Sequence, residues 1–155
     1  MNITIFRIDD RLIHGQVVTA WIAYSDAKQI LVADDKAATD SLQQSLLKMA
    51  TPKSVKLDIM SLDDAKLKIE TDASDTKTLL LVRGPAQALT LIDACKEVNS
   101  INIGNLNMKK GKRKILDNCW VDEDEVSNLK KLGEKVEVEV RAIPKDRKQN
   151  LMNLL

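Results

Sequence analysis

The chain has 155 residues, which is enough for one domain with a substantial core, and we expect a single domain over residues 1–155. Its 24 basic residues are balanced by 23 acidic ones and the two signs are interspersed, which argues against a nucleic-acid-binding protein. The sequence does not start like a signal peptide, and no apolar run approaches the roughly 20 residues that cross a bilayer, so we expect a soluble, cytoplasmic protein.

Short β-rich runs alternate with amphipathic segments along the chain. The expected strands are residues 2–7, 29–33, 55–60, 77–82, 100–103, 119–121 and 136–141. The expected helices are residues 15–24, 39–50, a segment from the N-cap Ser61 to about residue 70, and residues 85–98, 123–132 and 145–154. Residues 136–141 alternate Val with Glu or Arg, which is typical of a half-exposed edge strand. The alternation predicts an α/β fold with an open, mostly parallel sheet and helices on both faces.

Ligands of such sheets bind beyond the carboxyl ends of the strands, at a point where the topology switches. The strand ends of interest are residues 9–16, Asp34-Asp35, Arg83-Gly84 and Gly104-Asn105. The only histidine of the chain, His14, lies in the first of these loops, close to two arginines, two aspartates and a glycine. This loop is therefore the first candidate for a functional site.

A lone imidazole in such a loop is suited to carry a phosphoryl group, because phosphoryl transfer needs a positioned nucleophile and stabilisation of charge. Neutral imidazole keeps one nitrogen lone pair free, and Asp9, Asp10 or a loop carbonyl could accept a hydrogen bond from the other nitrogen. Arg11 offers a planar fork of donors for phosphate oxygens, and Arg7 is a second candidate. Gly15 lets the backbone approach the phosphate, and the N–H groups of the helix that begins there would face the added charge.

The same residues have a plainer interpretation. A single histidine beside polar residues is usually a surface or capping residue. Arg11 would then be an ordinary surface cation, and Asp9 or Asp10 a turn or cap residue. The residue types alone leave both interpretations open.

A metal site is not expected. Cys95 and Cys119 lie far apart and near no second thiol or histidine, and two thiols and one imidazole do not complete a tetrahedral zinc site. We expect two reduced, mostly buried thiols.

The run RIDDRLIHGQVV, residues 7–18, closely resembles the active-site loop of the mannose/fructose/sorbose family of bacterial phosphotransferase-system IIB proteins. The resemblance covers nearly the whole chain. Further similar positions are Trp21, residues 30–35, residues 46–48, Pro52, residues 102–105, Gly111-Lys112, Val121-Asp122 and the Leu-rich C-terminal segment. The resemblance implies an open, mainly parallel α/β sheet with one antiparallel edge strand, in agreement with the pattern of elements.

In that family a histidine accepts phosphate from a IIA protein and passes it to an incoming sugar, and the resemblance gives this role to His14. It makes Arg11 the phosphate partner and Asp10 a supporting residue. The weaker candidates for phosphate or partner binding are Arg7, Asp9, Gly15, Gln16, Asp34, Arg83, Gly104 and Asn105.

Some of the weaker candidates have structural alternatives. Arg83 is also explained as a surface cation, and it departs from the more usual Lys or Asn before proline. Asp34 is also explained as a helix cap, and Gly104-Asn105 as a simple turn. Many relatives carry Gly-Gly at that turn, and the Gly-Asn form resembles the N-acetylgalactosamine branch of the family.

The resemblance thus predicts an enzyme, a cytoplasmic IIB subunit that works at the inner face of the membrane through IIC and IID components. It would take phosphate from a separate IIA protein and phosphorylate a hexose or an amino sugar, without a cofactor. One alternative is a regulatory module of the same fold whose phosphorylation only reports the state of the system. Another is an α/β enzyme for a small ligand, although the first strand lacks the G-x-G-x-x-G turn that binds nucleotides.

Overall fold

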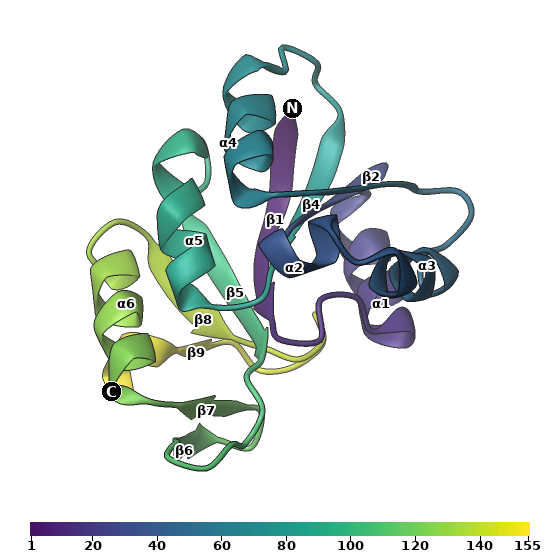
Figure 1. Ribbon diagram of the computed structural model, residues 1–155. Helices are drawn as coiled ribbons and strands as arrows, with labels where there is room; N and C mark the ends of the chain where they lie inside the picture. The colour runs from purple at the N-terminus through teal and green to yellow at the C-terminus, as the bar shows by residue number, and fades with distance from the viewer.

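Nine strands and six α-helices follow one another along residues 1–155, all of which the computed structural model describes (Figure 1). The strands are β1 (Asn2–Asp9), β2 (Gln29–Ala33), β3 (Lys56–Met60), β4 (Lys77–Val82), β5 (Ser100–Asn105), β6 (Arg113–Leu116), β7 (Cys119–Val121), β8 (Glu137–Val140) and β9 (Gln149–Asn150). The helices are α1 (Gly15–Ser25), α2 (Asp35–Ala38), α3 (Ser41–Met49), α4 (Leu62–Thr71), α5 (Pro85–Leu91) and α6 (Glu123–Gly133), with two 3₁₀ turns, η1 (Ile92–Ala94) and η2 (Leu151–Asn153).

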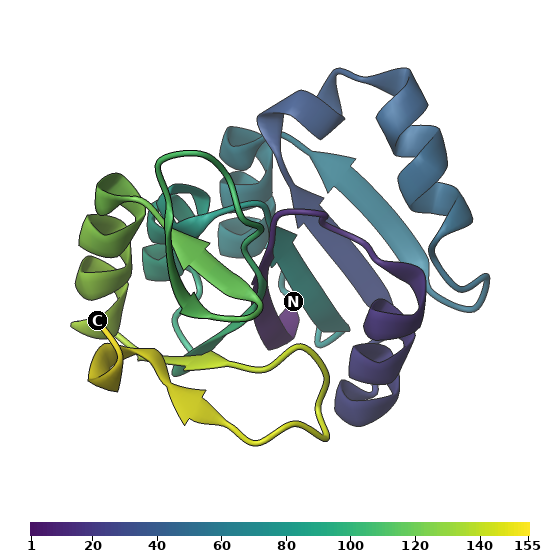
Figure 2. The same cartoon turned by 90° about the horizontal axis from the view of Figure 1, so that it is seen from below.

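Seven strands form one sheet in the order β3-β2-β4-β1-β5-β8-β9, in which only the pair β8 and β9 is antiparallel. The remaining strands, β6 and β7, form a separate antiparallel hairpin between β5 and α6. Helices α4, α5 and α6 pack on one face of the sheet, and α1 packs on the opposite face (Figure 2). The predicted fold class, a mostly parallel α/β sheet with helices on both faces and an antiparallel edge strand, is confirmed.

The buried strand β4 shows how one run of sequence builds both cores. Leu79 and Leu81 belong to the core on the α1 side, together with Trp21. Leu80 and Val82 belong to the larger core beneath α4, α5 and α6. Because successive side chains of a strand point to opposite faces, a central strand must be apolar throughout. The carboxyl end of β1, next to β4, is therefore held between two packed layers.

The expectation that residues 136–141 form an edge strand is wrong. β8 lies between β5 and β9, and Glu139 in its middle is 2% exposed. The carboxylate of Glu139 accepts hydrogen bonds from Nδ2 of Asn102 and from Nε and Nη2 of Arg141, each at 3.0 Å. A charged residue at the outward position of the alternation is thus buried because neighbouring side chains satisfy it.

The helix expected over residues 145–154 is also absent. That segment contains β9, which pairs Gln149 with Val140, and then the short turn η2. Leu151 is fully buried in the larger core, and the Asn150 side chain caps the turn by accepting from the amide of Met152 at 3.0 Å. The preceding stretch has no apolar residue at helical spacing, so no helical face could be buried there.

Two other expected helices are shorter than predicted. The helix expected over residues 39–50 corresponds to α3 alone, which begins after its N-cap Asp40. The short helix α2 before it, with Asp34 as its N-cap, was not predicted. The helix expected to reach residue 98 ends as α5 at Leu91 and continues only as η1. The cap of α4 was predicted correctly, since Ser61 accepts a hydrogen bond from the amide of Asp64 at 3.1 Å.

Arg7 occupies a buried position in β1, where only 1% of its surface is exposed. Its guanidinium donates to Oδ1 of Asn102 at 2.6 Å and to Oδ2 of Asp9 at 3.1 Å. It also donates to the carbonyl oxygens of Arg141 and Ala142 at 3.2 and 3.1 Å. Burial lowers the pKa of Arg7 to about 10 against the opposing effect of Asp9, so the group stays charged at neutral pH.

Gly104 leaves the space that this guanidinium occupies. A Cβ atom at Gly104 would overlap Cζ and both Nη atoms of Arg7. Arg7 is paired with Asn102 in the register of β1 and β5, two residues before Gly104. The glycine is therefore required by packing inside the sheet, which corrects the expectation of a simple turn at this position.

The two cysteines are free and buried, as the sequence predicted. Burial raises the pKa of Cys95 and of Cys119 to about 12. Both groups therefore remain thiols at neutral pH, the form in which cysteine is least reactive.

We expect Gly104→Ala to destabilise the protein by about 2–4 kcal/mol, because the added methyl group must displace a buried guanidinium and break its hydrogen bonds. Urea unfolding followed by circular dichroism measures this change. Gly15→Ala is the matched control, since a Cβ there meets only the Ala50 carbonyl oxygen at 3.9 Å. Equal stability of the two variants would show that Arg7 does not need the space at Gly104.

Candidate active site

His14 lies on the surface, in the loop between β1 and α1, and is the N-cap residue of α1. Its backbone is extended, with φ −120° and ψ 111°, and its carbonyl accepts the first hydrogen bond of the helix from Val18 at 2.9 Å. The imidazole does not cap the helix and forms no hydrogen bond within the chain. An unbonded imidazole thus stands beside the free N–H groups of the first turn of α1.

The loop is anchored immediately before this histidine. Leu12 and Ile13 are buried in the smaller core, and Leu12 adopts a left-handed backbone conformation with φ 60°. Its amide donates to the carbonyl of Asp9 at 2.9 Å, and the amide of Asp10 donates to the carbonyl of Asn105 at 3.0 Å. A leucine rarely adopts positive φ, so packing of the side chain and these hydrogen bonds hold a strained turn in place.

Asp9 binds two arginines with one buried carboxylate. Oδ1 accepts from Nε of Arg11 and Oδ2 from Nη2 of Arg11, both at 3.0 Å, so the pair is bidentate. Oδ2 also accepts from Nη2 of the buried Arg7 at 3.1 Å. The hydrogen bond to Asp9 raises the pKa of Arg11. Nη1 of Arg11 donates to no group of the chain, and 34% of its side chain is exposed, so donors remain free on the outer side of the fork.

Asp10 connects the loop to the segment that follows β5. Its Oδ1 accepts from the side-chain amides of Asn105 at 2.9 Å and Asn107 at 3.1 Å. Its Oδ2 accepts from the backbone amide of Asn107 at 2.7 Å. Both aspartates thus bind other donors. The sequence suggests Asp9 or Asp10 as an acceptor for the imidazole of His14, but neither accepts a hydrogen bond from it.

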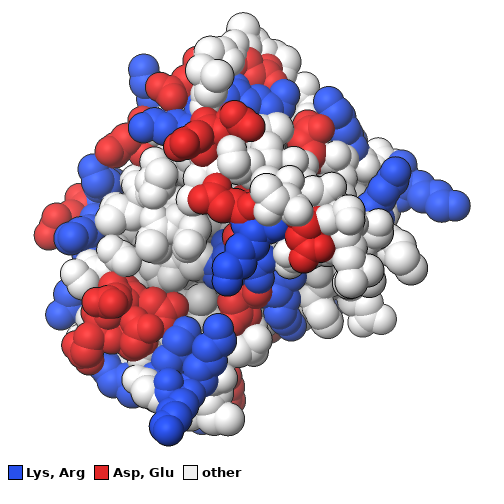
Figure 3. All heavy atoms as spheres, viewed as in Figure 1, with Lys and Arg blue, Asp and Glu red and all other residues white.

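Arg83 connects the ends of β2 and β4 to the same loop. Its Nε and Nη2 donate to the two carboxylate oxygens of Asp34 at 3.1 and 2.9 Å, and its Nη1 donates to the carbonyl of Asp10 at 3.3 Å. The hydrogen bond to Asp34 raises the pKa of Arg83. Asp34 also caps α2 by accepting from the amide of Ala37 at 2.9 Å. Its interpretation as a helix cap is therefore correct, but Asp34 also binds Arg83. Basic and acidic side chains meet near the centre of the face seen in Figure 3.

The structure joins the four strand ends that the sequence singled out. Hydrogen bonds run from Asn105 through Asp10 to Arg83 and Asp34. Gly15 and Gln16 lie in the first turn of α1, with Gln16 exposed. Arg7 and Gly104 lie behind the surface, where they support Asp9 and have no access to a ligand on His14.

Sequence reasoning missed Asn107, which supplies two of the donors to Asp10. A signal for it existed, because Asn107 follows Gly104-Asn105 by only two residues and so belongs to the same strand end. It also missed the support that Arg141 and Ala142 give to Arg7, for which no local pattern exists.

No group of three or more His, Cys, Asp or Glu residues is placed to hold a metal ion. None of the helices combines the length and the apolar character that crossing a bilayer requires.

Comparison with known proteins gives a consistent assignment. Residues 3–155 match the family model of the PTS system sorbose subfamily IIB component. The chain is 36% identical over 157 residues to the N-acetylgalactosamine-specific phosphotransferase enzyme IIB component 2 of Escherichia coli, with 99% of each chain covered. It is 31% identical over 159 residues to the mannose-specific EIIAB component of Escherichia coli, covering 100% of this chain and 49% of that longer protein.

Solved structures agree with this assignment. The crystal structure of the IIBSor domain of the sorbose permease from Klebsiella pneumoniae superposes with a TM-score of 0.92 at 28% identity, covering 99% of this chain and 95% of that one. IIB components act as phosphotransferases of sugar-specific systems and work in general with IIA and membrane IIC and IID components. The chain belongs to the sorbose subfamily of the phosphotransferase-system IIB components, in the family that also includes mannose-, fructose- and N-acetylgalactosamine-specific members.

Proposed function

We propose that His14 is the residue through which this IIB component carries the phosphoryl group. The observation that carries the proposal is the exposed, unbonded imidazole at the N-terminus of α1, in the same loop as an arginine whose outer donors are free. A nitrogen lone pair of neutral His14 attacks the phosphorus of a phosphorylated IIA protein, and the bond between the phosphorus and the donor residue of IIA breaks as the new N–P bond forms. In the second step a sugar hydroxyl attacks, the N–P bond of His14 breaks, and the hydroxyl proton leaves to a base.

Arg11 stabilises the transferring group. Its inner donors are fixed by Asp9, and its outer N–H groups remain for phosphate oxygens, a geometry suited to a planar, negatively charged transition state. The N–H groups of the first turn of α1 add their partial positive charge. Asp9 acts as a positioning residue, because it turns the guanidinium outward in one fixed orientation, and Arg7 acts through Asp9 in the same way.

Asp10 and Arg83 hold the loop. Asp10 ties it to Asn105 and Asn107, and Arg83 binds its backbone through the Asp10 carbonyl. With these ties at both sides, the histidine is presented from a rigid turn rather than from a mobile loop. Gly15 and Gln16 face the incoming group from the first turn of α1.

The partners follow from the family. The phosphoryl donor is a IIA protein, which in the mannose-specific relative is, by its name, joined to IIB in one EIIAB component. The acceptor is a sugar presented by membrane IIC and IID components, so the protein works in the cytoplasm at the inner face of the membrane. The 36% identity to an N-acetylgalactosamine-specific IIB component, together with Gly104-Asn105, supports an amino sugar as the substrate.

We expect His14→Ala to abolish labelling of the protein by phosphoenolpyruvate, enzyme I, HPr and the cognate IIA protein. Wild type should acquire one phosphate that is labile in acid and stable in base, as a phosphoramidate is. The imidazole forms no hydrogen bond, so the variant should unfold at the same urea concentration as wild type. Equal labelling of the folded variant would exclude His14 as the carrier.

Arg11→Gln should slow phosphoryl transfer to sugar by roughly 10²–10³-fold, the usual cost of removing one group that stabilises transition-state charge. Arg11→Lys should recover only part of this loss, because an ammonium keeps the charge and lacks the fork. Arg113→Gln is the matched control, since Arg113 is half-exposed on β6 and makes only a 4.0 Å contact with Glu123. Transfer rates measured from purified phosphoprotein to sugar in membrane vesicles provide the test, and wild-type rates in Arg11→Gln would remove Arg11 from the mechanism.

A further inference from the structure

An apolar stripe on α3 faces solvent close to the candidate active site. Leu42, Leu46 and Met49 follow one another at helical spacing and are 69%, 57% and 82% exposed. The other large exposed apolar residues of the chain are scattered over different elements. Single apolar residues on a surface are ordinary, whereas three aligned on one short helix mark an interaction surface. Figure 3 shows a broad uncharged area over α3, at the right of the view.

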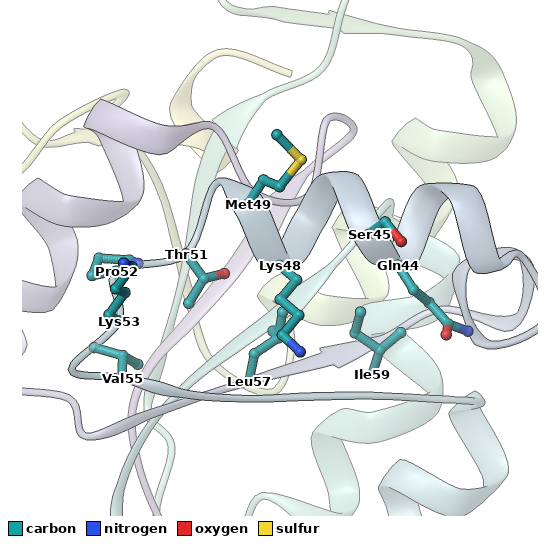
Figure 4. Close-up of a pocket in the computed structure, with 10 residues that line it drawn as sticks. All are labelled: Gln44, Ser45, Lys48, Met49, Thr51, Pro52, Lys53, Val55, Leu57 and Ile59. Atoms are coloured by element: carbon teal, nitrogen blue, oxygen red, sulfur yellow. The ribbon is translucent and has the colours of Figure 1, made fainter.

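Next to this stripe lies a groove of about 950 Å³, the most extensive of the described hollows, between α3 and the outermost strand β3. Its lining includes the apolar side chains of Val55, Leu57 and Ile59. Figure 4 shows Lys48 directed from α3 toward Leu57 and Ile59, whereas Met49 points away from them. The groove thus runs along the free edge of the sheet, and Met49 is the residue of the stripe that borders it.

The stripe is continuous with the phosphotransfer site. Met49 also borders a second hollow, whose other walls include Gly15 and Gln16 in the first turn of α1. These residues follow His14 directly. A protein that exchanges a phosphoryl group with His14 covers about 800 Å² of surface, a patch roughly 16 Å in radius. From Leu42 to Met49 the stripe is about 11 Å long at 1.5 Å per residue, so it falls within such a footprint.

The fixed charge of the groove is entirely positive. Among the residues that line the two hollows, only Lys48 and Lys53 are ionisable, and neither forms an ion pair within the chain. An occupant must therefore present apolar side chains flanked by carboxylates or by another anionic group.

We propose that the α3 stripe and groove are the docking surface for the phosphoryl donor, the IIA protein, which would bring an apolar patch with acidic residues at its margin. This inference rests on the proposed role of His14. It predicts that the donor approaches from the α3 side, so that the phosphorylated residue of IIA reaches His14 along the hollow between Met49 and α1.

The positive charge of the groove favours the IIA protein over three other occupants: a second copy of the chain, the membrane components and a lipid surface. A second copy of the chain would bring its own Lys48 and Lys53 against the same groove, placing like charges together across a twofold axis. Cytoplasmic loops of membrane components carry an excess of Lys and Arg and would be repelled in the same way. A lipid surface is captured by clusters of four to eight basic residues, more than the two in this groove.

The experiment compares Leu46→Asp/Met49→Asp with Leu67→Asp. All three side chains are more than half exposed, and Leu67 lies on α4, so it serves as a matched control for adding an acidic residue at an apolar surface position. Binding of the purified, unphosphorylated IIA protein is measured by calorimetry, and phosphorylation of His14 by phospho-IIA is measured as KM and kcat. We expect the double variant to weaken binding and raise KM by roughly 30-fold or more with kcat little changed.

Lys48→Glu/Lys53→Glu should slow association with IIA and reduce its dependence on salt, because complementary charge acts mainly on the rate of encounter. Both double variants, Leu46→Asp/Met49→Asp and Lys48→Glu/Lys53→Glu, are also phosphorylated beforehand with excess donor. They should then pass phosphate to sugar in membrane vesicles at the wild-type rate. Loss of that second step, alone or together with the first, would overturn the assignment to the donor. Unchanged IIA binding, or a wild-type dimer that the double variant dissolves, would overturn it as well.

Failure of the docking surface and failure of the proposed function give different results. Binding of unphosphorylated IIA involves no chemistry and is measured equally well with His14→Ala. If His14→Ala still accepts phosphate, the proposed carrier is wrong while the binding data stand by themselves. If His14 is the carrier and the α3 variants bind IIA normally, only the docking surface is wrong.

Discussion

The geometry of the site depends on one buried carboxylate shared by two guanidinium groups. Asp9 ends β1 with 1% of its surface exposed, and it binds Arg7 on the buried side and Arg11 on the outer side. Removing Asp9 would leave the buried guanidinium of Arg7 without its counter-ion, and breaking a buried ion pair in this way typically costs several kcal/mol. The carboxylate that neutralises Arg7 therefore also fixes the orientation of the Arg11 guanidinium. An exposed arginine with many rotamers becomes a rigid donor because its inner face is committed to a residue that cannot move.

The same requirement extends through the sheet. Arg7 needs acceptors on its other side and finds Asn102 on β5, and Asn102 in turn donates to Glu139 on β8. Three parallel strands are thus joined by side chains as well as by backbone hydrogen bonds. Gly104 belongs to this system although it has no side chain, because the guanidinium of Arg7 fills the place where a Cβ would lie.

Local patterns predicted the parts of the fold whose cause is local. Residues 29–33 and 77–82 were predicted to the residue, because runs of buried apolar side chains have no competing structure. The strand ends followed from the topology of a parallel sheet, whereas the role proposed for His14 came from the resemblance of its loop to a known family. Two of the failures had distant causes. Glu139 looked exposed because its partner Asn102 lies 37 residues away in sequence. The role of Arg7 depends on carbonyl groups 134 and 135 residues further on, which no periodicity reveals.

Those late partners also set when the site can form during synthesis. The residues of the loop leave the ribosome well before the acceptors of Arg7, since the carbonyls of Arg141 and Ala142 follow Arg7 by 134 and 135 residues. Until that segment has emerged and paired, two of the hydrogen bonds that orient the guanidinium of Arg7 cannot form, and Arg7 holds Asp9 less firmly. A nascent or truncated chain that ends before residue 141 would therefore carry the complete motif without the orientation of Arg11 that the motif serves. Because contacts between residues so far apart in sequence form late, the surface around His14 reaches its final geometry only when the rest of the sheet has folded.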